Sequence, residues 1–312
     1  MKRASERLPT LDNTASDMTR ALHWVVGIVA FFLAAYLILG YAVAARLSAP
    51  VRKPVERTPA DVGLGYREVG LRTSDGLRLS AWWVERGSSR AAVLVHGWGA
   101  GRASRHVLET AVVYEEAGFD VLMLDLRAHG KSEGGRVTLG YREVRDVQAA
   151  LSWLEKRGYE QVVLHGWSMG GAAVIQAAPE TGVAAVVGES AYADLPPLLR
   201  ERLPEASGLS AFFTPGIFLS GRYFLGIDPW AVRPVEETRQ LGREGVPFMI
   251  IHSRDDELVP FEQAETLARA HPSATFWEIS GYGHVGAHEH PEYRERLLGF
   301  LDEAVSPRSV VV

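Results

Sequence analysis

A serine flanked by glycines is the residue of this sequence with the clearest capacity for chemistry. Ser168 stands in a Gly-x-Ser-x-Gly arrangement, after an apolar run of strand type and before a helix-compatible run. A sharp strand-to-helix turn strains the backbone at the serine, and side chains at Gly166 and Gly170 would collide with neighbouring elements. The turn lifts the hydroxyl out of a sheet at the positive end of the following helix. Because a strand and a helix flank it, the motif predicts a nucleophile at Ser168.

A serine nucleophile needs a base and an acid that orients the base. Asp255, Asp256 and Glu257 follow an apolar run directly, and His284 follows another run through a glycine-rich loop. If these runs are parallel strands, the candidates gather with Ser168 at one edge of the sheet, where open α/β folds place their sites. The chain order Ser, Asp, His is that of the α/β-hydrolases. Spacing alone leaves the acid open among the three carboxylates.

The elements needed to position these residues are visible as short apolar runs that alternate with amphipathic stretches. Residues 64–84 predict a hairpin that turns at Ser74-Asp75-Gly76. Runs rich in Val, Ile and Leu predict buried parallel strands over 91–95, 121–124, 162–164, 183–187, 247–251 and 275–279. The intervening stretches predict crossover helices over 102–117, 140–157, 169–178, 261–270 and 291–304. This alternation predicts one doubly wound α/β domain over residues 63–305, with helices on both faces of the sheet.

The N-terminal part of the chain predicts a membrane anchor. The 25 residues between Arg20 and Arg46 include no Lys, Arg, Asp or Glu. As a helix they extend about 37 Å, which exceeds a hydrocarbon core of about 30 Å. The run is longer than the apolar part of a signal peptide, so we expect an uncleaved, single-pass anchor over 21–45 in the cell membrane. Four basic residues precede the run and four follow it, so the positive-inside rule assigns no side.

Composition narrows the remaining function classes. The chain has 312 residues, a net charge of −5 and no cysteine. A nucleic-acid footprint, disulfides, thiolate metal sites and a cysteine nucleophile are therefore not expected. The histidines lack metal-ligand spacing, so no metal and no cofactor are predicted. Residues 1–20 and 306–312 are predicted as tails, and the proline-rich residues 46–62 as a linker that acts as a tether.

Four motifs resemble those of α/β-hydrolases in the branch that includes monoacylglycerol lipases and serine aminopeptidases, particularly its membrane-anchored members. In chain order they are His96-Gly97-Trp98-Gly99, residues 125–132, the turn around Ser168, and Asp256-x-x-Val-Pro260 with Gly283-His284. The resemblance covers about residues 64–304 and implies an α/β-hydrolase fold. It selects Asp256 as the acid, with Asp255 as the remaining alternative. It also favours His284 over His288 and His290, which we expect at the start of the last helix.

The resemblance also implies further site residues. The backbone N–H groups of Trp98 and Met169 would form the oxyanion hole, and residues 191–235 would form a cap. Five aromatic cap residues are predicted to bind substrate: Phe212, Phe213, Phe218, Tyr223 and Phe224. His96 and His129 are interpreted as loop-bracing residues. Glu189 and Ser190 end a strand, and either line the pocket or have a structural role.

These features together predict a membrane-anchored serine hydrolase that cleaves a carboxylic ester, such as an acylglycerol or a lysolipid. One alternative is a serine aminopeptidase or amidase with the same triad, in which Glu201 or Glu205 of the cap would hold a substrate amine. A second alternative is a non-catalytic membrane scaffold. The sequence does not determine the acyl length or the oligomeric state.

Overall fold

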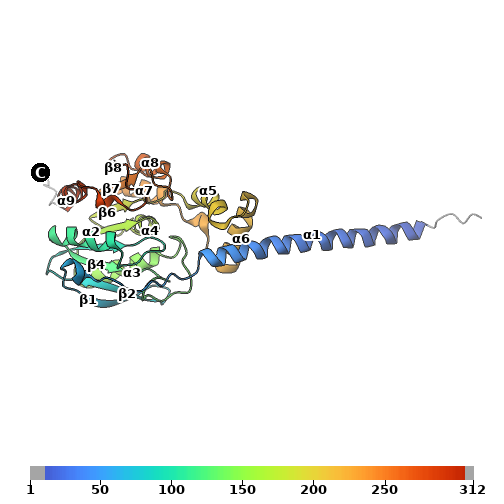
Figure 1. Ribbon diagram of the computed structural model, residues 1–312, viewed down its shortest axis with the longest axis horizontal. Coiled ribbons are helices and arrows are strands. Elements are labelled where there is room, and N and C mark those ends of the chain that lie inside the picture. The colour runs from blue at the N-terminus through green and yellow to red at the C-terminus, as the bar shows by residue number, and fades with distance from the viewer. Residues whose placement is uncertain (1–10, 306–312) are drawn as a thin grey trace, which may run out of the picture.

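An eight-stranded sheet organises the computed structural model, which describes residues 11–305 (Figure 1). The spatial order of the strands is β1-β2-β4-β3-β5-β6-β7-β8. In this order the pairs β1–β2 and β2–β4 are antiparallel. Every following pair, from β4–β3 to β7–β8, is parallel. The strands are β1 (Arg67–Arg72), β2 (Arg78–Val84), β3 (Arg90–Val95), β4 (Asp120–Leu124), β5 (Gln161–Trp167), β6 (Ala185–Glu189), β7 (Phe248–Ser253) and β8 (Thr275–Ile279).

Helices cover both faces of this sheet, as the alternating pattern predicted. One apolar core lies between the sheet and α3 (Val144–Glu155), α4 (Met169–Ala177), α7 (Pro234–Glu244) and α8 (Phe261–Ala270). The other core lies between the opposite face and α2 (Arg105–Glu116) and α9 (Tyr293–Val305). The central strands are buried on both sides, which is why their sequences are continuous apolar runs rather than alternating ones.

The predicted elements differ from the observed ones mainly at their ends. The strand predicted over 183–187 is observed at Ala185–Glu189, and the helix predicted from 102 begins at Arg105. Helix α7 was not predicted. His288 belongs to a short 3₁₀ turn, η4 (Ala287–Glu289), and His290 follows it, so both precede α9 rather than begin it. The shifts are small because the core fixes where an element packs, whereas hydrogen bonds at its ends decide where it stops.

The first helix is longer than the predicted anchor. Helix α1 (Leu11–Leu47) includes residues 11–20 of the predicted N-terminal tail, while residues 1–10 and 306–312 lie outside the described part. Most of α1 projects away from the body (Figure 1). By length and composition, Asp17–Leu47 is able to cross a membrane, and its most apolar part is almost entirely exposed in the isolated chain.

The expectation that residues 46–62 form a free tether is wrong. Val51 forms a parallel bridge with His129, and its N–H donates to the carbonyl of Ala128. The Arg52 guanidinium donates to the carbonyls of Gly130, Ser132 and Gly134. A 3₁₀ turn, η1 (Pro59–Val62), then leads into the sheet. The segment is therefore a packed connection, because its backbone finds acceptors and donors on the body that composition alone does not reveal.

The cap predicted over 191–235 consists of short helices between β6 and α7. These are α5 (Leu195–Ser207), η2 (Ala211–Phe213), α6 (Thr214–Leu225) and η3 (Pro229–Ala231). Helix α6 packs along the last turns of α1 (Figure 1). A Cβ added at Gly40 would lie 2.6 Å from the carbonyl oxygen of Gly216, so the two backbones are nearly in contact there. The Ser220 hydroxyl donates to the carbonyl of Leu37 at 3.0 Å. Helix α1 and the cap thus form one packed unit.

The contact between Gly40 and Gly216 provides a test of this packing. We expect Gly40→Leu to force α1 and α6 apart and to lower the free energy of unfolding by about 2 kcal/mol or more, because overpacked positions relax poorly. Thermal unfolding of the full chain in detergent measures the change. Gly27→Leu is the matched control, since Gly27 lies on the same helix with open space around it. Equal behaviour of the two variants would contradict the close contact.

Candidate active site

The turn between β5 and α4 places Ser168 in a conformation that few residues adopt. Its φ is 52° and its ψ is −118°, in a region unfavourable for residues with a side chain. A Cβ at Gly166 would lie 2.3 Å from the carbonyl oxygen of Gly170. A Cβ at Gly170 would lie 2.1 Å from the carbonyl oxygen of Val95. Both glycines are therefore required, because the turn brings backbones closer than any side chain permits.

The loop after β3 lies directly against this turn. A Cβ at Gly97 would lie 3.1 Å from the Cβ of Ser168, so the loop passes closely over the serine. Trp98 follows Gly97 in this loop. Met169 is the first residue of α4, so its N–H has no acceptor within the helix. The two amides predicted to form an oxyanion hole therefore belong to segments that meet at Ser168, which is itself only 8% exposed.

Two buried histidines brace the loops around the site. The Nδ1 of His96 lies 2.8 Å from the carbonyl oxygen of Gly97, and its Nε2 accepts from the N–H of Leu126 at 3.1 Å. The His129 Nδ1 lies 2.9 Å from the carbonyl oxygen of Arg127. Burial, and then the neighbouring His129, lower the pKa of His96 to about 4, so this ring stays neutral near pH 7. Both side chains hold backbone groups, consistent with the bracing role interpreted from the sequence.

Asp256 and His284 meet at the carboxyl ends of β7 and β8. The Nδ1 of His284 lies 2.8 Å from Oδ2 of Asp256. The other carboxylate oxygen accepts from the N–H groups of Leu258 and Val259, each at 2.9 Å. Burial by itself would raise the pKa of Asp256, but the hydrogen bonds and the charge of His284 outweigh it and lower that pKa. An ionised Asp256 accepts the Nδ1–H of His284 and leaves Nε2 available as a base.

Asp255, the alternative acid, has different partners. Its Oδ1 accepts from the Ser253 hydroxyl at 2.6 Å and from the N–H of Gly281 at 2.7 Å. Its Oδ2 accepts from the N–H of Gly283 at 3.1 Å. These hydrogen bonds, with the Ser253 hydroxyl first, lower the pKa of Asp255 to about 2. Asp255 therefore shapes the loop that carries His284, while Asp256 contacts the imidazole.

Glu189 and Ser190 connect the serine turn to the histidine loop. The N–H of Ser168 donates to the carbonyl of Glu189 at 2.8 Å. The Ser190 hydroxyl accepts from the N–H of Val285, the residue after His284, at 3.2 Å. Ser190 and Val285 both have positive φ values, 51° and 54°. Of the two roles left open for this pair, the structure supports the structural one.

The Glu189 side chain is buried behind the site. It accepts from the indole N–H of Trp167 at 2.8 Å. Burial raises the pKa of Glu189 to about 7, against the effect of the Trp167 hydrogen bond.

His252 was not singled out from the sequence. It lies at the end of β7, where its Nε2 is 2.9 Å from the carbonyl oxygen of Val259 and 3.4 Å from Oδ2 of Asp256. It is fully buried, and burial lowers its pKa. The side chain supports the loop that carries Asp256. The available signal was a histidine within an otherwise apolar strand, four residues before the acid.

An open groove of about 580 Å³ lies at His284 and contains charged residues. Helix α5 of the cap contributes one wall of this groove, through Arg202, Glu205 and Ala206. The Arg202 guanidinium lies 3.2 Å from a carboxylate oxygen of Glu201 and 3.6 Å from one of Glu205. Both acidic residues considered for binding a substrate amine are therefore paired with an arginine.

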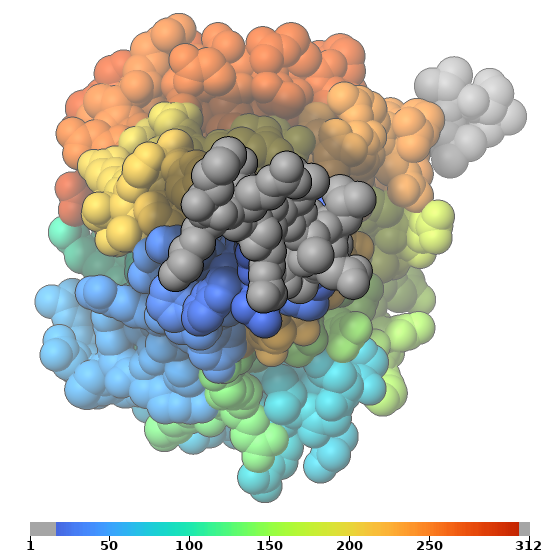
Figure 2. Space-filling view, turned by 90° about the vertical axis from the view of Figure 1, so that its right-hand side faces the viewer, coloured from blue at the N-terminus to red at the C-terminus, as the bar shows by residue number. Residues whose placement is uncertain are grey.

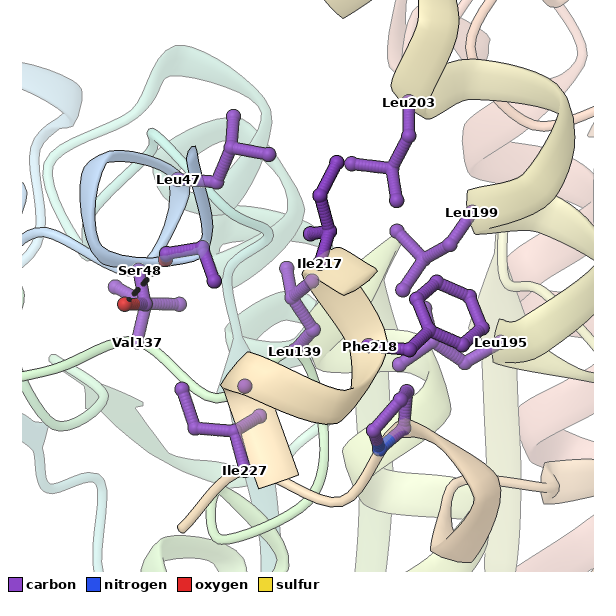
Figure 3. Close-up of a pocket in the computed structure, with 13 residues that line it drawn as sticks. Leu47, Ser48, Val137, Leu139, Leu195, Leu199, Leu203, Ile217, Phe218 and Ile227 are labelled. Carbon is purple, nitrogen blue, oxygen red and sulfur yellow. Dashed lines mark hydrogen bonds between the residues drawn. The ribbon is translucent and has the colours of Figure 1, made fainter. Parts of the chain in front are cut away.

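A separate apolar cavity of about 60 Å³ lies where α1 meets the cap (Figure 3). Leu195, Leu199 and Leu203 of α5 line it, together with Ile217 and Phe218 of α6. The last turn of α1 and the loop before α3 close the other side, through Ala44, Leu47, Ser48, Val137 and Leu139. Almost every lining side chain is aliphatic or aromatic, so the cavity suits a hydrocarbon group.

The five aromatic residues predicted to bind substrate do not share one pocket. Phe218 is buried and lines the apolar cavity. Phe213 stacks on Tyr36 of α1 with ring centroids 5.5 Å apart. Phe212, Tyr223 and Phe224 are more than 60% exposed on the outer surface of the cap. The five residues predicted to bind substrate therefore lie in different places, because Phe212 and Phe213 belong to η2, whereas α6 turns Phe218 inward and Tyr223 and Phe224 outward.

No group of three His, Asp or Glu side chains within residues 11–305 is arranged to hold a metal ion. The groups gathered at the sheet edge are instead a hydroxyl, an imidazole–carboxylate pair and backbone amides. These are the groups that acyl transfer through a covalent intermediate requires.

Comparison with known proteins agrees with this architecture. The protein YfhR of Escherichia coli K12 is 25% identical over 256 residues, which cover 77% of this chain and 82% of YfhR. The mouse lysophosphatidylserine lipase ABHD12 is 25% identical, over 73% of this chain and 60% of its own length. The crystallised esterase Pf2001 of Pyrococcus furiosus superposes with a TM-score of 0.68 at 24% identity and covers 83% of this chain and 99% of the esterase.

The family model described as the alpha/beta hydrolase family matches residues 92–294, which include the loop after β3, the serine turn and the histidine loop. This match spans well over half of the chain and the fold agrees with it throughout. The protein therefore belongs to the alpha/beta hydrolase family.

Proposed function

We propose that this hydrolase is a membrane-anchored serine esterase whose triad is Ser168, His284 and Asp256. The observation that carries the proposal is the 2.8 Å contact between His284 and Asp256, at the same sheet edge as the strained turn of Ser168. The ties through Glu189 and Ser190 support it, since they link the serine turn to the histidine loop.

The proposed reaction uses each of these groups in turn. The Ser168 oxygen attacks the ester carbonyl carbon while its proton passes to Nε2 of His284. The oxyanion of the tetrahedral intermediate accepts from the N–H groups of Trp98 and Met169, each contributing about 3 kcal/mol to transition-state stabilisation. His284 then protonates the leaving alcohol, which departs and leaves an acyl-enzyme. Water, deprotonated by the same imidazole, releases the acid and restores the serine.

The proposed substrate is an ester with one apolar and one polar part, which matches the character of two separate pockets that share no lining residue. The groove at His284 contains charged side chains, whereas the cavity beside the cap is lined by Leu199, Ile217 and Phe218. Acylglycerols and lysolipids combine these properties. The similarity to a lipase named for lysophosphatidylserine supports the same substrate class. An amine subsite is less favoured, because Arg202 pairs with both Glu201 and Glu205.

The anchor is proposed to remain on the mature protein. Its apolar segment is long enough to span the bilayer. Cleavage near Ala44 would remove Tyr36 and Gly40, which pack against the cap through a hydrogen bond and a backbone contact. Loss of these contacts would expose part of α6, so retention of α1 is the arrangement that keeps the cap intact.

The first test is covalent labelling of the nucleophile with a fluorophosphonate probe. Ser168→Ala is expected to abolish labelling of the full-length protein, because the probe requires an activated serine. Ser152→Ala, an exposed substitution on α3, is expected to label fully and serves as the control. Labelling of Ser168→Ala at the rate of the parent protein would reject the assignment.

A second test separates the two neighbouring aspartates. Asp256→Asn is expected to lower kcat by about 10⁴-fold, because it removes the acceptor that fixes the imidazole tautomer. Asp255→Asn is expected to cause a much smaller loss, since its carboxylate contacts backbone amides of the loop. Steady-state kinetics with a p-nitrophenyl ester measures both. A larger loss for Asp255→Asn would reverse the two roles.

A third test concerns the bond that is cleaved. Turnover of p-nitrophenyl esters of increasing chain length is expected to exceed that of aminoacyl anilides. Glu205→Gln is expected to leave ester turnover nearly unchanged, because the carboxylate has no role in the ester mechanism. Faster anilide turnover that falls in Glu205→Gln would favour the aminopeptidase alternative.

A further inference from the structure

Helix α6 of the cap is mostly apolar on three sides, and its one charged residue, Arg222, is about half exposed and lies 3.4 Å from a carboxylate oxygen of Asp228. Ile217, Phe218 and Leu225 are buried against the cap interior. Gly216 and Ser220 face α1. The remaining side presents Leu219, Tyr223 and Phe224, which are 40%, 71% and 62% exposed. A helix with a single charged residue and no wide polar face is suited to a largely apolar environment. Water around the third side of α6 would contact large apolar groups, which soluble surfaces seldom gather in one place.

The contact between α6 and α1 is of the kind used between helices in membranes. Small residues, Gly40 on α1 with Gly216 and Ser220 on α6, let the backbones approach closely. The Ser220 hydroxyl donates to the carbonyl of Leu37, and the Tyr36 hydroxyl accepts from the N–H of Gly216 and donates to the carbonyl of Phe212 in η2. Close packing through small residues, reinforced by polar side chains, is the usual basis of helix association in lipid.

The position of the contact along α1 coincides with one end of the membrane span. From Ala21, a hydrocarbon core of about 30 Å corresponds to about 20 residues and ends near Tyr41. The cap contacts α1 at this level, with Phe212 beside Tyr36 at 5.3 Å and Phe224 beside Tyr41 at 6.3 Å between ring centroids. These two levels are about 7.5 Å apart along the helix, which matches the depth to which interfacial helices sink into a bilayer.

Basic residues near the exposed aromatic side chains also indicate the boundary of the membrane span. Arg46 lies in the last turn of α1, five residues after Tyr41, and Arg222 lies on α6 directly before Tyr223. Basic groups next to a band of Tyr and Phe are typical of the boundary between hydrocarbon and headgroups. Figure 2 views the molecule along α1 and shows the yellow part of the cap beside the blue helix, on the face from which α1 leaves the body.

We propose that the outer face of the cap, formed by Phe212, Leu219, Tyr223 and Phe224, is a lipid-binding surface that inserts into the bilayer next to α1. The occupant is the interfacial layer of the membrane that α1 spans, so this inference rests on the anchoring part of the proposed function. Its consequence is that the cap stands between the bilayer and the groove at His284.

Site-directed spin labelling tests the proposal directly, because the chain has no cysteine and each introduced cysteine is unique. The full chain is reconstituted into phosphatidylcholine vesicles with a nitroxide at Tyr223→Cys or, separately, at Phe212→Cys. Collision with oxygen, which concentrates in lipid, is compared with collision with a water-soluble nickel chelate. Both labels are expected to show a ratio of oxygen to nickel accessibility several-fold above that of Lys156→Cys, an exposed position at the opposite edge of the sheet.

A label at Gly27→Cys, in the exposed middle of α1, reports on the anchor independently. If this label lies in lipid while the two cap labels contact the nickel chelate freely, the cap proposal fails and the anchor stands. If the label at position 27 is in water, both the anchor proposal and the cap proposal fail. If the cap labels are shielded from oxygen and nickel alike, a protein covers the patch and the lipid proposal is overturned. None of these readouts depends on hydrolysis, so the triad is tested separately.

Discussion

The close approach of backbones at the serine turn is the constraint on which the rest of the site depends. Gly166 and Gly170 allow β5, α4 and the end of β3 to meet at distances that exclude a Cβ. The same approach brings the loop of Gly97 against Ser168 and leaves the first amide of α4 without a helical acceptor. The strained backbone at Ser168 and its close neighbours thus arise from one local geometry, supported by the buried sheet beneath it.

Around this turn, the other site groups are held by loops that interlock. Asp255 fixes the amides of Gly281 and Gly283, while Ser190 fixes the residue after His284. Asp256 is held by two backbone amides before it contacts the imidazole. These hydrogen bonds hold the loops on both sides of the Asp256–His284 contact. The imidazole is therefore oriented with little reorganisation. The two adjacent aspartates therefore differ in their partners: Asp255 contacts backbone amides of the histidine loop, and Asp256 contacts the imidazole.

Helix α1 and the cap form a second unit, which is packed through small residues and a hydrogen bond between α1 and α6. Close contact through Gly40 and Gly216 makes α1 part of the wall of the apolar cavity, through Ala44 and Leu47. Helix α1 therefore contributes directly to the packing of the cap. It completes a cap whose inner face lies next to the groove and whose outer face is apolar.

The sequence by itself determined the features that depend on local sterics and periodicity. The apolar runs identified the parallel strands, the Gly-x-Ser-x-Gly motif identified the turn at Ser168, and the long uncharged run identified α1. Each of these is encoded within one segment, because burial on two faces and a strained turn both restrict the residue types that are tolerated.

Only the tertiary structure decided which distant residues meet. It placed Asp256 rather than Asp255 against His284, and packed residues 46–62 onto the body instead of leaving a tether. It also divided the aromatic cap residues among an inner cavity, the anchor and the outer surface. A shift of one residue in a loop, or of one turn in a helix, changes which residues meet across segments. The local sequence pattern stays the same after such a shift. Their energies come from packing between segments, which composition and spacing do not record.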